Sequence, residues 1–395
     1  RMDEQYAEYQ RFMAWLESQG KLDRELEFLP TDDQLTDRLN RQQPVWTRPE
    51  LAVLTCYSKV MLKEALLEAD LLSDPVLARS VGRAFPPALV ERYGTEVSEH
   101  QLRQEIASTQ LANDLVDRVG FAFFFRQMEF TGGSAGDVIR AYTIVMGTLN
   151  INGLWEQIEQ ADLPAKVQLE LLHILIRLAR RTTRWVLRNR RLNINCTEMI
   201  EQFSQPMQDL LWHLPELHEA EWTNLWLAEK QVLSDLGVEN QLAGRLAASD
   251  SMFMSMGIVD TALHLNQPIH QVAELNFKLG EYLSLDWFMA QIVDLQPHNR
   301  WQDLAREAYV DDLEGQRRRL SACLLKASTV ADMGLLLSNW QAQHPQLIRR
   351  WKSMVKDLRH SGTPDFAMIS VALRELLSLV QSSVDAALET DSVND

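Results

Sequence analysis

Four arginines on one segment form the pattern in this sequence that could most readily do chemistry. Residues 165–191 contain no Pro or Gly and have the spacing of one long helix. At about 100° per residue, one side of that helix carries what we call the arginine ridge, namely Arg177, Arg181, Arg184 and Arg188. Guanidinium groups bind carboxylates and phosphates through paired hydrogen bonds, so the ridge could hold an anionic ligand or an acidic partner.

The charge balance favours a different partner for this ridge. Asp and Glu number 55 against 39 Lys and Arg, which gives a formal net charge of −16. The chain's own carboxylates can therefore neutralise the ridge. We expect the ridge to act first as an internal or interdomain electrostatic tie, and second as a site for a ligand.

The histidines and glycines do not add a catalytic or metal-binding pattern. His213 and His218 are the closest histidine pair, but Pro215 separates them and they do not share a helical face. The glycine-rich turn at 131–137, TGGSAGD, lacks the G-x-G-x-x-G spacing and follows no strand. Ser134 and Asp137 within it have the spacing of a helix cap. We predict no metal site and no cofactor-binding site.

Acidic residues are abundant but do not suggest acid–base catalysis. Asp311, Asp312 and Glu314 precede the basic run 317–319 on one predicted helix, so we expect solvated salt bridges there. Neither a G-x-S-x-G elbow nor a phosphate-binding loop occurs in the sequence. We therefore predict no catalytic residue in this chain.

Composition and charge limit the setting and the partners. Hydrophobic residues make up 46% of the 395 residues, which is typical of a folded protein. The net negative charge argues against nucleic acid as the main partner. We find no apolar run close to the ~18 residues of a membrane span, and expect no membrane contact. The three cysteines lie far apart, so we expect no disulfide framework and a cytoplasmic location.

The segments that must position these residues all have helical periodicity. Cap signals at Thr31 with Gln34, at Ser98 with Gln101 and at Ser134 with Asp137 predict helix starts. No β-branched run alternates with polar residues between turn signals. We predict an all-α fold, an irregular multi-helix bundle of packed helical hairpins with two subdomains. The limits we expect are a helical segment 1–47, subdomains 48–195 and 196–388, and a disordered tail 389–395.

Several long stretches also resemble one known family in the right order. They include RPELAVLTCYSK (48–59), HQLRQEIASTQLANDLVDRVG (100–120), RRTTRWVLRNRR (180–191), VAELNFKLGEYLSLDW (272–287) and FAMISVALRELLSL (366–379). These stretches resemble the large NAD-specific glutamate dehydrogenases of bacteria. The resemblance spans nearly the whole chain and is weakest over 192–249.

This resemblance implies a C-terminal piece of a much longer enzyme, one that oxidises L-glutamate to 2-oxoglutarate and ammonia with NAD. In that family the nucleotide- and glutamate-binding parts lie upstream, and residues 1–30 resemble the start of the helical tail that follows them. Such a piece would be inactive alone. It would contact the upstream catalytic domains of the same polypeptide, within a homo-oligomer, and serve domain packing, subunit assembly or regulation.

Two other interpretations remain open from the residues alone. The chain could be a stand-alone helical interaction module that captures an acidic partner through the arginine ridge. It could also be a helical enzyme whose site leaves no recognisable motif. An anion bound by the ridge would favour the first of these, and turnover by the isolated chain would favour the second.

Overall fold

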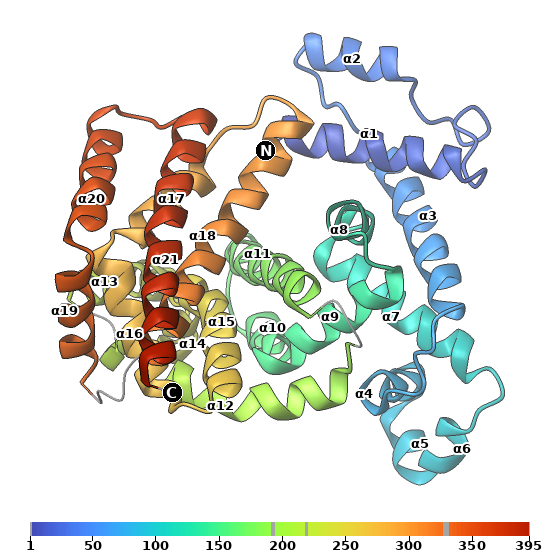
Figure 1. The fold of residues 1–395 in the computed structure, drawn as a ribbon. Helices are drawn as coiled ribbons and strands as arrows, with labels where there is room; N and C mark the ends of the chain where they lie inside the picture. The colour runs from blue at the N-terminus through green and yellow to red at the C-terminus, as the bar shows by residue number, and fades with distance from the viewer. Residues whose placement is uncertain (1, 191–193, 218–219, 327–331, 395) are drawn as a thin grey trace. The chain divides into compact units, whose positions relative to one another are not determined.

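The computed structural model describes residues 2–190, 194–217, 220–326 and 332–394. Helices dominate these residues, and none of them forms a strand (Figure 1). The predicted all-α fold is therefore confirmed. By their contacts the residues divide into two compact units, of which unit 1 comprises Arg1–Glu156 with Leu172–Gln202 and unit 2 comprises Gln157–Leu171 with Phe203–Asp395.

Unit 1 is built mainly from short and medium helices. Its elements are α1 (Met2–Ser18), α2 (Asp32–Asn40), α3 (Arg48–Leu67), α4 (Pro75–Ala78), the 3-10 helix η1 (Arg79–Ala84), α5 (Pro87–Arg92), α6 (Gly94–Ser98), α7 (Arg103–Val119), α8 (Phe123–Thr131) and α9 (Ala135–Thr148). Three further helices have residues in both units, namely α10 (Ile151–Gln160), α11 (Ala165–Asn189) and α12 (Cys196–Leu217).

Unit 2 contains the longer C-terminal helices. They are α13 (Ala220–Asp235), α14 (Asn240–Ala247), α15 (Ser249–Leu265), α16 (Ile269–Tyr282), α17 (Leu285–Asp294), α18 (Arg300–Lys326), α19 (Met333–Gln343), α20 (Pro345–His360) and α21 (Phe366–Asn394). The subdomain limits predicted after residues 47 and 195 stay predictions. For the expected tail 389–395, the structure describes only the backbone up to Asn394, as part of α21.

Local sequence explains where several helices begin. Thr31 and Gln34 form the predicted capping box at the start of α2, and Ser134 with Asp137 does the same for α9. The cap predicted at Ser98 was wrong. Ser98 is the last residue of α6, its hydroxyl donates to the Thr95 carbonyl, and α7 begins only at Arg103.

Aromatic packing between α1 and α8 forms one part of the core of unit 1. The rings of Phe12 and Trp15 on α1 lie 5.6 and 5.1 Å from the ring of Phe125 on α8. Phe124 and Phe121 contact the same group, with ring centroids 6.0 and 5.8 Å from that of Phe12. Because aromatic side chains bury large apolar areas, this cluster fixes α1 against the α7–α8 corner.

Indole groups buried in unit 2 hold its C-terminal helices together. Trp340 on α19 donates from Nε1 to the hydroxyl of Ser383 on α21, at 2.9 Å. Trp351 on α20 donates from Nε1 to the Leu283 carbonyl, also at 2.9 Å. Both indoles are almost fully buried, so each satisfied N–H avoids the cost of an unpaired donor.

Among the described residues, one stretch is long and apolar enough to cross a membrane, over Phe366–Ala387 of α21, with a mean hydropathy of 1.3. The expectation that no such run exists was wrong. This stretch packs beside α18 and α20 (Figure 1). Its Glu375 is buried and forms an ion pair with Arg350 on α20, with 2.9 Å between Oε1 and Nε. Core helices of folded proteins can be equally long and apolar. The contacts of this stretch are those of a core helix.

Candidate functional site

The arginine ridge lies on α11, which begins at Ala165 and ends at Asn189, while residue 191 of the predicted helix lies outside the described residues. Its four members differ in exposure. Arg177 and Arg188 are exposed, Arg181 is half-buried, and Arg184 is only 7% exposed. At 1.5 Å per residue, the two exposed arginines are about 16 Å apart along the helix. The exposed members of the ridge thus lie at its two ends, with Arg181 and Arg184 between them.

Arg180, the neighbour of the ridge, contacts the end of α7. Its Nε and Nη2 both donate to the carbonyl oxygen of Val119, the last residue of α7, with 2.9 Å from Nε. Its guanidinium also lies over the Phe123 ring, 5.7 Å from the centroid. The pKa of Arg180 lies below its ordinary value, mainly because of burial. The Glu8 carboxylate opposes this shift, and the charge of Arg126 adds to it.

Gly120 makes room for this contact. Its backbone has a φ of +93°, which an L side chain rarely adopts, and a Cβ there would lie 2.9 Å from Arg180 Nη2. Glycine is the residue that tolerates both conditions. Gly120, the residue directly after α7, therefore leaves the Val119 carbonyl open to the guanidinium.

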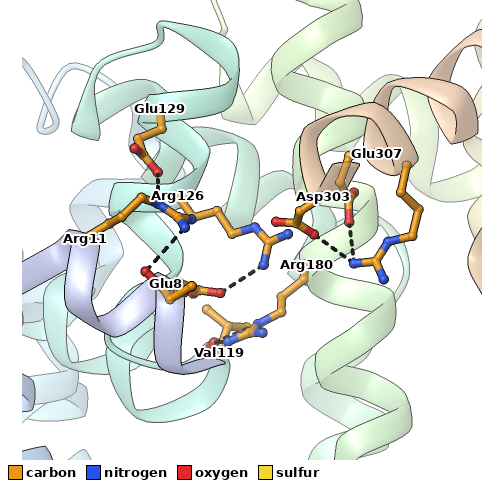
Figure 2. Close-up of polar contacts among 10 residues, drawn as sticks. Glu8, Arg11, Val119, Arg126, Glu129, Arg180, Asp303 and Glu307 are labelled. Carbon is orange, nitrogen blue, oxygen red and sulfur yellow. Dashed lines mark hydrogen bonds and ion pairs between the residues drawn. The ribbon is translucent and has the colours of Figure 1, made fainter. Parts of the chain in front are cut away.

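Two carboxylates and two more arginines surround this contact within unit 1. Glu8 on α1 is 5% exposed and pairs with Arg126 on α8, with 2.9 Å between Oε2 and Nη1. Arg11, one turn further along α1, places Nε 3.5 Å from an oxygen of Glu129 on α8. Figure 2 shows these groups together with Arg180 (Figure 2). We call this set the charged cluster, comprising Glu8, Arg11, Arg126, Glu129 and Arg180.

The chemistry available to the charged cluster is electrostatic rather than catalytic. Guanidinium groups stay protonated at all ordinary pH values, so they cannot act as general acids or bases. Glu8, the buried carboxylate, is held by Arg126. The cluster therefore ties three elements, α1, α8 and the part of α11 in unit 1, to each other and to the end of α7.

A second polar site in unit 1 gathers around Asp74, which precedes α4. Its carboxylate accepts hydrogen bonds from the backbone N–H of Cys196 at 2.7 Å, the Val76 N–H at 2.9 Å and the Thr197 hydroxyl at 3.0 Å. Burial raises the pKa of Asp74, but these donors outweigh it and hold the pKa below the usual value of 3.8. Asp74 thus caps α4 and the first turn of α12 with one carboxylate.

A cavity of about 360 Å³ adjoins Asp74 and is lined also by Ser73, Asp137, Arg140, Ile194 and Asn195. Arg140 is engaged within the protein, because its Nη2 donates to the Asp70 carbonyl at 2.6 Å. Burial raises the pKa of the Cys196 thiol, which keeps it protonated and unreactive.

Of the two histidines discussed from the sequence, the structure describes His213. His218 lies outside the described residues, and the His213 ring contacts that of His270 at 4.8 Å between centroids. Where the structure gives side-chain positions, no three His, Cys, Asp or Glu residues gather to hold a metal ion.

The charged flank expected over 311–319 is not fully solvated, which corrects the sequence interpretation. Glu314 and Arg317 on α18 are 9% and 6% exposed. Arg317 donates from Nε and Nη2 to the Asn276 carbonyl, at 3.1 and 2.9 Å, and from Nη1 to Asp286 at 2.6 Å. The helix periodicity was read correctly, but the exposure of this face depends on α15 and α16 packing over it, which the sequence does not reveal.

Sequence reasoning did not identify the charged cluster or Asp74 as sites. The partners in each site come from segments far apart in the sequence. Arg126 and Glu8 are 118 positions apart, and Cys196 and Asp74 are 122 positions apart. The one local signal was Gly120, which follows a long periodic segment and marks a helix end that needs a partner.

Comparison with known proteins gives the family. The family model described as glutamate dehydrogenase, C-terminal, matches residues 44–378. Three similar proteins are each named NAD-specific glutamate dehydrogenase. The one from Pseudomonas aeruginosa is 40% identical over 390 residues, the one from Halomonas elongata 36% over 381, and the one from Mycobacterium tuberculosis 30% over 372.

These matches cover 97%, 96% and 94% of this chain but only 24%, 24% and 23% of the relatives. The chain thus spans about a quarter of the length of the curated relatives that it matches. The resemblance seen in the sequence is confirmed, and the chain belongs to the glutamate dehydrogenase C-terminal family.

Proposed function

We propose that this chain is the non-catalytic C-terminal helical region of a large NAD-specific glutamate dehydrogenase. The enzyme would convert L-glutamate, NAD and water into 2-oxoglutarate, ammonia and NADH, with the chemistry in the part of the polypeptide outside this chain. The match of the family model over residues 44–378 carries the proposal. NAD would then be the cofactor of the longer enzyme and not of this region.

Within that enzyme, the region would support the catalytic part through domain packing, subunit assembly or regulation. The polar sites favour such a role, because their charged groups bind other groups inside unit 1. Arg180 binds a backbone carbonyl, Glu8 binds Arg126, and Asp74 caps two helices. A homo-oligomer in the cytoplasm and contact with the upstream domains belong to the same proposal.

Activity and cofactor binding by the isolated chain test this proposal. The purified chain should form no NADH from L-glutamate and NAD, and calorimetry should detect no NAD binding. The Pseudomonas aeruginosa relative, assayed under the same conditions, is the positive control. Glutamate-dependent turnover by the isolated chain would contradict the assignment of the chemistry to the missing part.

The longer polypeptide provides the complementary test. If the gene encodes a protein of the relatives' length, removal of the region 1–395 should lower its activity, its oligomeric mass or its response to metabolites, which activity assays and light scattering measure. A truncated enzyme that retains full activity, mass and response would contradict a supporting role.

A further inference from the structure

The loop between α1 and α2 exposes its apolar residues in an unusual way. Phe28 is 91% exposed and has a φ of +54°, in the left-handed region that a bulky side chain rarely adopts. Leu26, two residues earlier, is 72% exposed. A strained backbone and an aromatic ring left in water both cost free energy in the free chain. We call these two side chains the Leu26–Phe28 knob.

Polar contacts fix the loop in this conformation. Asp23 accepts hydrogen bonds through Oδ1 from the backbone N–H groups of Glu25 and Leu26, at 3.0 and 3.1 Å. Arg24 pairs with Glu17 on α1 and with Asp32 on α2, each at 2.7 Å. The base of the knob is therefore held to both flanking helices.

Further contacts fasten the rest of the loop. The Leu29 N–H donates to the Arg24 carbonyl at 2.8 Å, and the Tyr57 hydroxyl of α3 donates to Glu27 at 2.7 Å. Leu22 and Leu29 are each 6% exposed, so they anchor the loop while the knob faces solvent. An ordered loop has already lost its conformational entropy, which is the property of a preorganised binding element.

From this arrangement we propose that the Leu26–Phe28 knob inserts into an apolar pocket, rimmed by basic residues, on the part of the longer polypeptide outside this chain. The proposal rests on the proposed function. About three quarters of the length of the relatives lies beyond what this chain matches, so a covalently linked partner of that size exists in them. Buried aromatic anchors of this kind carry most of the free energy at protein interfaces.

Charge decides between that partner and a second copy of the chain. The loop and its flanks carry an acidic rim of Glu17, Asp23, Glu25, Glu27 and Asp32, against Lys21 and Arg24. Two acidic rims that face each other repel, and an acidic rim needs a basic counterpart. A basic-rimmed pocket on a different part of the polypeptide meets that need.

Binding between the two pieces of the polypeptide tests the proposal. The rest of the polypeptide encoded by the same gene is expressed separately and titrated with the chain by calorimetry. We expect Phe28→Ser to weaken binding about tenfold or more, as for an interface anchor. Val232→Ser, which changes a 60% exposed residue of α13, is the matched control and should bind like the wild type.

A second variant separates docking from folding. Phe28→Gly removes the ring and suits the positive φ, so the melting temperature of the free chain should rise while binding weakens. A fall in both would mean that the ring stabilises the chain itself and would overturn the proposal. Glu25→Lys should slow association and reduce its salt dependence, because Glu25 is an exposed member of the acidic rim.

The outcomes distinguish this proposal from the proposed function. If the two pieces bind and form NADH together, but Phe28→Ser binds like the wild type, the knob proposal fails and the proposed function stands. Self-association of the chain that Phe28→Ser abolishes would assign the knob to a second copy and overturn the proposal. If the pieces neither bind nor form NADH together, both proposals fail.

Discussion

Arg180 of α11 binds Val119 at the end of α7 through two donors on one carbonyl oxygen. A carbonyl at a helix C-terminus has no partner within its own helix, and here a guanidinium 61 residues away supplies it. The contact thereby joins the family-like stretch 100–120 to the stretch 180–191. It is a structural connection within unit 1 and leaves Arg180 unavailable to a ligand.

Replacement of Arg180 by Met should therefore destabilise the chain. The Val119 carbonyl would lose both donors, and an unsatisfied buried acceptor costs about 1–3 kcal/mol. Urea unfolding followed by circular dichroism measures this change. The exposed Arg177 on the same helix is the control, and Arg177→Met should change stability by less than about 0.5 kcal/mol. Equal effects of the two variants would refute a special role for Arg180.

Glycines on two helices of unit 2 should respond in opposite directions to alanine. A Cβ on Gly280 of α16 would clash with Nη2 of Arg317 and lie 2.6 Å from its Cζ. Arg317 cannot easily move, because Asn276 and Asp286 hold its guanidinium. Gly280→Ala should destabilise unit 2 by about 1–3 kcal/mol, the usual cost of overpacking.

Gly315 on α18 provides the matched comparison for Gly280. A Cβ there would meet no atom within 4 Å. Alanine is favoured over glycine inside a helix by about 1 kcal/mol, so Gly315→Ala should stabilise the chain. Thermal unfolding of both variants checks the pair. A destabilised Gly315→Ala variant, or a neutral Gly280→Ala variant, would show that the packing around α16 and α18 differs from this structure.

The pH dependence of stability should reveal Asp74. Its pKa lies below the unfolded value of 3.8, so the stability that it contributes is present above that value and is lost as the pH falls through the folded pKa. Asp74→Asn should destabilise the chain at pH 7, because the N–H of Cys196 and the Thr197 hydroxyl lose a charged acceptor.

The difference between the wild type and Asp74→Asn should then shrink in acid. Urea unfolding at neutral pH and below about pH 4 measures the two free energies of unfolding at each pH. Asp137→Asn, which changes the half-buried capping carboxylate of α9, controls for general loss of a helix cap. A gap between wild type and Asp74→Asn that stays constant with pH would contradict the depressed pKa.

Local signals predicted much of this fold, because the interactions behind them are local. The capping boxes at Thr31 and Ser134 join residues three positions apart, so their spacing alone identifies them. The box predicted at Ser98 failed because the chain forms a separate short helix, α6, which ends at that residue. Helix boundaries of this kind depend on tertiary contacts that a sequence pattern does not contain.

The polar sites could not be predicted in the same way. Glu8 and Arg126 are 118 residues apart, and nothing in either neighbourhood indicates the other. The burial of Arg184 in the arginine ridge could not be predicted from the sequence either. Periodicity places four arginines on one side of α11 but does not show what covers Arg184. The family resemblance supplied what the residues alone did not, since it depends on long stretches in order rather than on contacts.

Charge reversal along α11 tests the role of the arginine ridge. The pair Arg181→Glu with Arg184→Glu should destabilise the chain strongly, because Arg184 is 7% exposed and the reversal buries a carboxylate among groups that suit a cation. The pair Arg177→Glu with Arg188→Glu changes two exposed residues by the same charge and should have little effect on the melting temperature. Differential scanning calorimetry compares the two pairs directly.

Ligand binding distinguishes the electrostatic tie from an anion site in the same variants. Inorganic phosphate titrated into the wild-type chain by calorimetry should give no saturable heat, because Arg184 is buried and the two exposed arginines are about three turns apart along α11. Saturable binding that the Arg181 and Arg184 pair abolishes at an unchanged melting temperature would instead identify the ridge as a ligand site. A lower melting temperature without any phosphate binding is the result expected of an internal tie.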